Sequence, residues 1–440
     1  MRTSKMTPEE LRSLESETPE DSVELVQQTE PIMFPEVNDS SWENKLQTTE
    51  KGVIKSTNYN VAQILHHDSE LVNLFAYNEL NDKVMLTRDI SHFKAGYNLG
   101  TLPTHIAVHI SKNYGINVPA QTVYGLIENE ASNHTFNPAK DYFRESFLAW
   151  DKKERLDSFF IDYLGVEDNA VTRKMTRIFF EGLVLKVKNP FIKFDRVLDL
   201  VGEQGVGKTW IMYKLGGFGR FYTDQITSVT DKDSKAEMTA NIIVNDDEMA
   251  VTNKMTFEEM KAFISSTEVT YRKPYATTQI TKGKGFVIVR STNNTEYLKD
   301  KTGNRRFMTM VVSKKRRTKN VSDLTEEDVM QVIGEAVSRY GSNDSLTEES
   351  TLSNEELQTA QYDSQYISLE EELMREYLAQ NPQIKFVSTA SIIENGLKQP
   401  NAVGNSSLAR KVSYYMSNLE GWERKVQKIN GQRVRGYARL

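Results

Sequence analysis

The chain has 440 residues, of which 38% are hydrophobic and 26% are charged, and its formal net charge is −6. This length suggests two to four domains of about 150 residues, and the composition is typical of a soluble globular protein. The chain shows no apolar run of the roughly 18 residues that span a membrane, and no apolar signal core near Met1. Its lack of cysteine excludes disulfides and thiolate metal sites. We therefore expect a cytoplasmic protein with no membrane partner.

Charge is distributed unevenly between the two ends of the chain. Residues 1–50 carry 12 acidic and 4 basic residues among scattered apolar ones, which predicts an acidic, mostly disordered arm. Residues 401–440 carry 8 basic and 2 acidic residues. This basic end is suited to phosphate contacts, although a solvated surface would have the same composition.

Residues 51–150 are predicted to form a mainly helical domain. Apolar residues recur at helical spacing over residues 61–76 and 105–114, and residues 122–132 are a further candidate helix.

A central domain is predicted at residues 151–345. It begins with helices over residues 157–188, continues into a strand at 196–201, and closes with a helix at 326–340 that has about one apolar residue per turn. After a polar linker, 346–365, a small unit follows at residues 366–440. The predicted helices of this unit are 369–379 and 406–419.

The most specific motif is a glycine-rich loop between the strand at 196–201 and a predicted helix at 210–215. It has the P-loop spacing of Gly, four residues and Gly-Lys-Thr. Its glycines let the backbone curl with the N–H groups inward, and the helix points its positive end at a phosphate. We expect Lys208 to bridge the β- and γ-phosphates of ATP and Thr209 to ligate Mg²⁺. The predicted nucleotide-binding residues are Gly202, Glu203, Gln204, Gly205, Val206, Gly207, Lys208 and Thr209.

A P-loop needs an acid at the end of a neighbouring strand, which holds Mg²⁺ and polarises water. After Asn241, a short apolar run at residues 242–244 ends in Asn245-Asp246-Asp247-Glu248. Asp247 is the first choice for Mg²⁺ and Glu248 for the attacking water. Because the strand register is uncertain by one residue, Asp246 remains an alternative.

Two later segments supply further candidates. A strand at residues 285–290 is followed by Asn293, the first choice for an amide that contacts the γ-phosphate or the attacking water, and by Asn294, the second choice. Arg305 and Arg306 precede another strand, 307–312, and one of them is expected to reach the γ-phosphate of a neighbouring subunit. An arginine acting in trans predicts a ring-shaped homo-oligomer, expected to be a hexamer, with ATP between subunits.

The motif set resembles the virulence-associated E family of phage and genomic-island proteins, which is related to superfamily 3 and poxvirus-type helicases. The resemblance covers roughly residues 58–340. It implies an AAA+ or superfamily 3-like P-loop ATPase that replicates phage or mobile-element DNA in a bacterial host. The chain departs from the family's pattern in two places. The family's acidic strand usually reads apolar-Glu-x-x-Glu, whereas Asn245-Asp246-Asp247-Glu248 stands here. The family often has an arginine soon after its Tyr-Arg-x-Pro-Tyr element, whereas residues 276–278 here are Ala-Thr-Thr. The segments that carry the resemblance are 150–151, 202–209, 261–263, 271–275, 291–293, 296–298 and 303–307.

The resemblance also implies a DNA-gripping β-hairpin within residues 269–285, with its tip at residues 282–285. Two tyrosines there are candidates for stacking on bases and four cations for phosphate contacts, although the tyrosines would also suit packing within the strand pair. The candidates are Tyr271, Arg272, Lys273, Tyr275, Lys282 and Lys284.

The last unit is expected to be winged-helix-like and to bind duplex DNA. Asn430-Gly431 is a strong hairpin signal. In a winged-helix module a helix enters a DNA groove and the basic hairpin that follows it contacts the DNA backbone. Docking on the ATPase ring or on the acidic arm is the alternative. The candidate contacts are Arg424, Lys425, Lys428, Arg433 and Arg435.

The predicted fold is α/β: a P-loop NTPase core with a helical N-terminal domain and a small winged-helix-like C-terminal domain. The first functional hypothesis is an ATP- and Mg²⁺-dependent DNA helicase or translocase acting on single- and double-stranded DNA, with a separate primase or initiator as a possible partner. The second is an ATP-driven DNA-binding initiator or remodelling switch that does not unwind processively. The third is a small-molecule kinase without a trans arginine.

Overall fold

The computed structural model describes residues 41–272, 279–294, 304–361, 369–402 and 405–440, except residues 418, 420 and 430. These residues fall into two compact units, with residues 41–361 in unit 1 and residues 369–440 in unit 2. In the described part of the chain, no helix has the length and apolar character needed to cross a membrane.

A five-stranded parallel sheet in the order β10-β4-β9-β6-β5 forms the centre of unit 1. Most of its residues are buried, as expected for a parallel sheet that is covered on both faces. The mixed α/β architecture with a parallel sheet is thereby confirmed. The four predicted strands are found within about two residues as β4, β6, β9 and β10, and the sheet also contains β5, which was not predicted. The five strands are β4 (Val197–Gly202), β5 (Tyr222–Thr223), β6 (Ile243–Asp246), β9 (Val287–Thr292) and β10 (Phe307–Val312).

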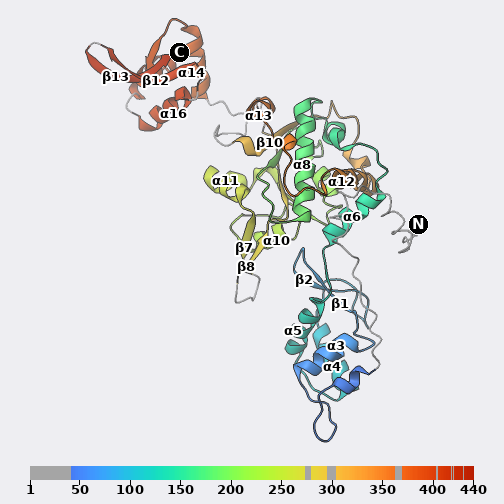
Figure 1. Cartoon of the computed structure of the whole chain (residues 1–440). Helices are drawn as coiled ribbons and strands as arrows, with labels where there is room; N and C mark the ends of the chain where they lie inside the picture. Colours follow the sequence, from blue (N-terminus) through green and yellow to red (C-terminus); the bar gives the residue numbers. More distant parts are fainter. Residues whose placement is uncertain are drawn as a thin grey trace. The chain divides into compact units, whose positions relative to one another are not determined.

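Three helices pack together beside this sheet. α8 (Ala170–Lys188) contacts β9, and it also contacts α12 (Glu326–Tyr340) and α6 (Pro138–Ala149) (Figure 1). Gly334 on α12 permits the close approach of α6, because a β-carbon there would lie 2.2 Å from the Ser146 carbonyl oxygen. The other α-helices described between residues 138 and 361 are α7 (Phe159–Leu164), α9 (Lys208–Leu215), α10 (Lys232–Thr239), α11 (Phe257–Ser265) and α13 (Asn354–Gln361).

The helix α6 shows that residue 150 does not separate two hydrophobic cores. Phe143 and Phe147 on α6 belong to the same hydrophobic core as β4, α8 and α12. The helix therefore packs with the sheet, and the structure places residues on both sides of position 150 in the same compact unit.

The N-terminal part of unit 1 contains helices and a small sheet, so the prediction of a mainly helical domain is only partly right. The predicted helix at 61–76 ends at His67, and residues 75–78 instead form a buried strand. Trp42 packs into the hydrophobic core of this N-terminal part, so residues 41–50 are not part of a disordered arm. Residues 1–40, the rest of the predicted arm, lie outside the described residues. The elements are α3 (Asn58–His67), β1 (Phe75–Asn78), β2 (Lys83–Leu86), α4 (Leu102–Tyr114), α5 (Ala120–Ala131) and β3 (Thr135–Phe136), with strand order β2-β1-β3.

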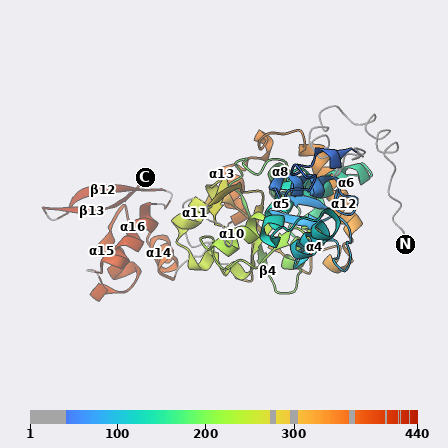
Figure 2. The ribbon, with the colours of Figure 1, turned by 90° about the horizontal axis from the view of Figure 1, so that it is seen from below.

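Unit 2 has its own hydrophobic core, to which Met374, Val412, Trp422 and Tyr437 contribute. The two helices predicted here are confirmed. Figures 1 and 2 show β12 and β13 as a long ribbon that extends beyond the helices of this unit. The elements are α14 (Leu369–Gln380), β11 (Phe386–Ser388), α15 (Thr389–Ser391), α16 (Ser406–Ser417), β12 (Trp422–Ile429) and β13 (Gln432–Arg439), with strand order β11-β13-β12.

Candidate functional site

The glycine-rich loop connects β4 to α9 and adopts a backbone that requires glycine. Gly202, Gly205 and Gly207 have φ angles of 141°, 74° and 107°, in the region that side chains rarely adopt. A β-carbon on Gly202 would lie 2.7 Å from the Val312 carbonyl oxygen, and one on Gly207 would lie 2.8 Å from a Val321 methyl group. The loop is therefore held close against the chain segment that follows β10.

Lys208 is turned back into the loop and is buried. Its ammonium donates to the carbonyls of Gly202 at 2.7 Å and Glu203 at 3.1 Å, and to Asn293 Oδ1 at 2.8 Å. Burial lowers the pKa of Lys208, while the carboxylates of Glu248 and Asp247 oppose this shift. The loop lysine and the predicted amide after β9 are thus in direct contact.

Asp247 and Glu248 both face this site. Asp247 Oδ1 accepts a hydrogen bond from Thr209 Oγ1 at 2.8 Å, and Glu248 Oε1 accepts one from Asn293 Nδ2 at 2.8 Å. Glu248 has φ 51° and ψ 22°, a left-handed conformation. Such strain in a non-glycine residue persists only where surrounding contacts hold it, and it is common at functional sites.

Asp246 faces elsewhere, so the alternative register for the acids is wrong. Its side chain is buried and accepts hydrogen bonds from the backbone N–H groups of Val251 and Thr252, both at 2.8 Å, and from the Thr252 hydroxyl. Asp246 therefore stabilises the turn after β6. Asn294, the second choice for the amide, has its N–H bonded to Thr292 Oγ1 at 3.1 Å, whereas Asn293 makes both contacts in the site.

Ser291 also belongs to the site, although it is not among the residues predicted for it. Its buried hydroxyl donates to Asp247 Oδ1 and accepts from the Glu248 N–H at 3.3 Å. Ser291 lies in β9, two residues before Asn293, which directly follows the strand, and side chains two apart in an extended chain share a face. That spacing is the signal that could have identified it.

Arg305 and Arg306 lie at the opposite edge of the sheet from the glycine-rich loop. β10 and β4 are parallel, with Phe307 beside Val197 and Val312 beside Gly202. At about 3.3 Å per residue, these five steps correspond to roughly 17 Å, which exceeds the reach of an arginine side chain. Neither arginine can therefore serve the loop of its own chain.

The predicted hairpin is present, but its predicted tip is wrong. β7 (Glu268–Tyr271) pairs antiparallel with β8 (Ile280–Gly283), with Tyr271 opposite Ile280 and Glu268 opposite Gly283. Residues 282–285 therefore lie at the base of the hairpin, and its connection spans residues 272–279. Arg272 is exposed at the start of the connection, whereas Lys273 and Tyr275 lie outside the described residues.

Two of the predicted DNA contacts are buried. Tyr271 is 6% exposed, and its hydroxyl lies 3.1 Å from Thr239 Oγ1. Lys284 is 2% exposed, and its ammonium donates to the carbonyls of Phe263 at 2.8 Å and Ile264 at 3.3 Å, at the C-terminus of α11. Both side chains pack inside unit 1, so the predictions that they bind DNA are wrong.

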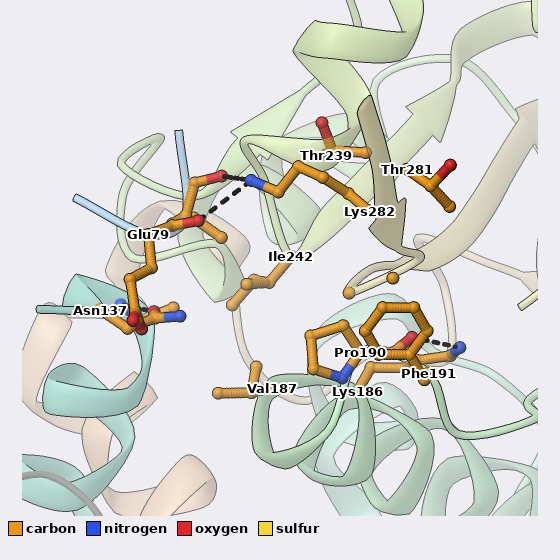
Figure 3. Close-up of a pocket in the computed structure, with 14 residues that line it drawn as sticks. Glu79, Asn137, Lys186, Val187, Pro190, Phe191, Thr239, Ile242, Thr281 and Lys282 are labelled. Atoms are coloured by element: carbon orange, nitrogen blue, oxygen red, sulfur yellow. Dashed lines mark hydrogen bonds between the residues drawn. The ribbon is translucent and has the colours of Figure 1, made fainter. Parts of the chain in front are cut away.

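Lys282 is also engaged with the protein itself. Its ammonium donates to the carbonyls of Glu79 and Leu80, both at 3.0 Å, and forms an ion pair with Asp82 at 3.0 Å. Figure 3 shows this side chain beside a cavity of about 280 Å³, with Pro190 and Phe191 at another part of its wall. The structure therefore does not present Lys282 as a DNA contact.

The ribbon in unit 2 carries most of its predicted DNA contacts on one face. Arg424 lies opposite Tyr437, Val426 opposite Arg435 and Lys428 opposite Arg433, and all three pairs share a face because side chains alternate along a strand. Val426 is 57% exposed, and the four basic side chains are exposed as well. Lys425 lies on the other face, 3.6 Å from Glu423.

Residues 145–366 match a family model described as the virulence-associated protein E-like domain. The chain belongs to this virulence-associated protein E-like family. No curated protein matches it. Solved structures to which this family member is similar include three apo structures of the C-terminal region of NrS-1, at 10% sequence identity. Their TM-scores are 0.39, 0.36 and 0.35, and the matches cover 88%, 83% and 83% of this chain and 100%, 96% and 96% of the other.

Proposed function

We propose that this chain hydrolyses ATP, with Mg²⁺, between the subunits of a ring, and that hydrolysis drives movement along DNA or its unwinding during replication of a phage or mobile element. One observation carries the proposal: Lys208, Thr209, Asp247, Glu248 and Asn293 form a connected set at the carboxyl ends of β4, β6 and β9. Ligands of open parallel sheets bind at this edge.

The side chains present suit a magnesium nucleotide. The Thr209 hydroxyl and the Asp247 carboxylate are oxygen donors, which Mg²⁺ prefers, and two protein ligands are typical where phosphates and water supply the others. The Lys208 ammonium now bonded to loop carbonyls would instead meet phosphate oxygens. Glu248, oriented by Asn293, would hold the attacking water and accept its proton. The nucleotide supplies the phosphoanhydride bond that is broken.

The position of Arg305 and Arg306 supports a site shared between subunits. Both lie too far from their own loop, yet an arginine at the γ-phosphate accelerates hydrolysis by about 10³–10⁵-fold in related chemistry. Arg305 is the better candidate because its side chain is exposed, whereas Arg306 Nε is bonded to Ser265 Oγ at 3.2 Å. The test mixes Arg305→Ala with Lys208→Ala protein. Partial recovery of ATPase activity supports a shared site, and no recovery in demonstrably mixed oligomers argues against it.

The exposed basic side chains of β12–β13 support binding of duplex DNA by unit 2, with α16 and the ribbon acting like a winged helix. The base of the same face packs on α16, since Tyr437 is buried there and its hydroxyl donates to the Ser413 carbonyl at 3.2 Å. The four cations of the ribbon suit backbone phosphates, and the exposed Val426 adds apolar contact. Arg272, at the start of the β7–β8 connection, is the described residue best placed for single-stranded DNA in that hairpin.

The test of the whole proposal is ATPase activity with and without single-stranded DNA, together with strand displacement on forked DNA. Wild-type protein should hydrolyse ATP faster with DNA and displace a strand. Lys208→Ala should be inactive, and Glu248→Gln should bind ATP but hydrolyse it about 10²–10⁴-fold more slowly. DNA binding and ATPase activity without displacement would favour the initiator or switch. Phosphoryl transfer to a small acceptor, unaffected by DNA, would favour a kinase.

A further inference from the structure

The segment between β10 and α12 lies along one flank of the glycine-rich loop. In the sheet, β10 is next to β4 on one side, whereas β9 and β6, which lead to Asn293 and the acids, are on the other. A β-carbon on Gly202 would touch Val312, one on Gly205 would lie near Lys314, and one on Gly207 would touch Val321. The loop therefore lies between an acidic flank and a second flank formed by residues 312–321.

This second flank is held in place by hydrogen bonds to the rest of unit 1. The Ser313 N–H donates to the Leu164 carbonyl at 2.9 Å, and Arg316 Nε donates to the Gly165 carbonyl at 2.8 Å. Arg317 Nη1 donates to the Val206 carbonyl of the loop itself at 3.2 Å. Lys314 therefore projects from a backbone whose position relative to the loop is fixed.

Lys314 places a cation directly beside the loop. A β-carbon on Gly205 would lie 3.1 Å from the Lys314 ammonium nitrogen, and the side chain is exposed. Within the part of the chain that the structure describes, no carboxylate or carbonyl pairs with this ammonium. A cation held without a counter-charge beside a loop of inward N–H groups makes an anion-binding site stronger.

The two flanks distinguish the two ends of a bound nucleotide. Under the proposed function, Asp247 would hold Mg²⁺, and Glu248 and Asn293 would hold the attacking water, so the γ-phosphate would lie on this acidic flank. Lys314 lies across the loop from them. We propose that Lys314 contacts the α-phosphate end of the nucleotide bound in the same subunit, and that it sets nucleotide affinity and not the rate of hydrolysis. This inference rests on the proposed ATPase function.

The test is isothermal titration calorimetry of the full chain with ADP and with the non-hydrolysable analogue AMP-PNP. Lys314→Ala should weaken both nucleotides by the same factor, roughly tenfold, which corresponds to about 1.4 kcal/mol. Lys314→Arg should recover most of the affinity because it keeps the charge. Lys315→Ala is the matched control, since Lys315 is the adjacent exposed lysine. In turnover, the KM for ATP should rise about tenfold in Lys314→Ala, with kcat nearly unchanged.

The outcomes separate this inference from the proposed function. If the wild-type protein binds neither nucleotide, the proposed function fails. If the wild-type protein binds both and Lys314→Ala binds as tightly as Lys315→Ala, the inference is overturned while the function stands. A loss confined to AMP-PNP would place Lys314 at the γ-phosphate and overturn the assignment to the α-phosphate end. Equal melting temperatures of the two alanine variants would show that folding is not the cause.

Discussion

The two hairpins of this chain have similarly basic sequences but use their cations in opposite ways. Lys282 and Lys284 of the β7–β8 region bond to carbonyls of unit 1. By contrast, Lys428 and Arg433 are exposed and form the second-last pair before the turn of β12–β13. The sequence shows charge in both places, but the position of a residue between base and tip decides whether the charge meets protein or solvent. Substitutions in each hairpin and beneath β7–β8 test this comparison.

Lys284→Glu should have the largest effect. The new carboxylate would be buried against the Phe263 and Ile264 carbonyls, which already carry partial negative charge at the C-terminus of α11. We expect the free energy of unfolding of unit 1 to fall by about 4 kcal/mol or more, measured by urea denaturation. Lys284→Met is the control, because it keeps the apolar stem and should cost much less. A stable Lys284→Glu protein with weakened DNA binding would break the comparison.

The combined change of Lys428, Arg433 and Arg435 to Ala should weaken duplex binding without loss of stability. The plot of log affinity against log salt has a negative slope whose magnitude is about 0.9 per phosphate contact, so three lost contacts should reduce this magnitude by about 2.7. Fluorescence anisotropy over a range of salt concentrations measures both affinity and slope. Lys425→Ala, on the opposite face of the ribbon, is the control and should change the slope by less than one. An unchanged slope in the triple variant would favour docking of this face on protein.

Most of the central sheet could be predicted from the sequence because its signals are local. The strand at 307–312 is found at Phe307–Val312, and the P-loop spacing placed the glycines where positive φ angles occur. Asp247, Glu248 and Asn293 could be proposed because polar residues that end neighbouring parallel strands meet at one edge. Periodicity and glycine spacing are properties of short segments, and the structure preserves them.

The remaining features depend on contacts between distant segments. Asp246 and Asp247 are adjacent and of the same type, so local sequence does not distinguish them. The side chain of Asp246 accepts hydrogen bonds from the N–H groups of Val251 and Thr252, and it therefore faces away from the glycine-rich loop. The predicted position of the hairpin tip is wrong because Lys-Gly-Lys-Gly at residues 282–285 has the composition of a turn. In the structure Gly283 instead permits close packing, since a β-carbon there would lie 2.6 Å from Pro190. Local pattern does not distinguish these two uses of glycine.

The pH dependence of stability probes the buried cations beneath the β7–β8 hairpin. Burial lowers the pKa of Lys186 to about 8, and it lowers that of Lys284 as well. In the unfolded chain both lysines hold their protons up to about pH 10.4. Between about pH 8 and pH 10 the unfolded state therefore binds more protons, and stability should rise with pH. Lys186→Met should flatten this rise in denaturation series from pH 7 to pH 10. The same slope in wild type and variant would contradict the assignment.

Lys282→Ala should have the smallest effect, and Arg272→Ala is its counterpart at the other end of the same hairpin. The Lys282 ammonium bonds to Glu79, Leu80 and Asp82, and it is partly exposed, so its loss should lower the free energy of unfolding by about 1 kcal/mol and leave single-stranded DNA binding unchanged. Arg272 is exposed where the connection begins, so its loss should weaken single-stranded DNA binding and leave stability unchanged. Because the two residues lie in one hairpin, opposite responses would show that position between base and tip determines the role of each cation. If both variants weaken DNA binding equally, the base of this hairpin opens during DNA binding and the contrast with β12–β13 does not hold.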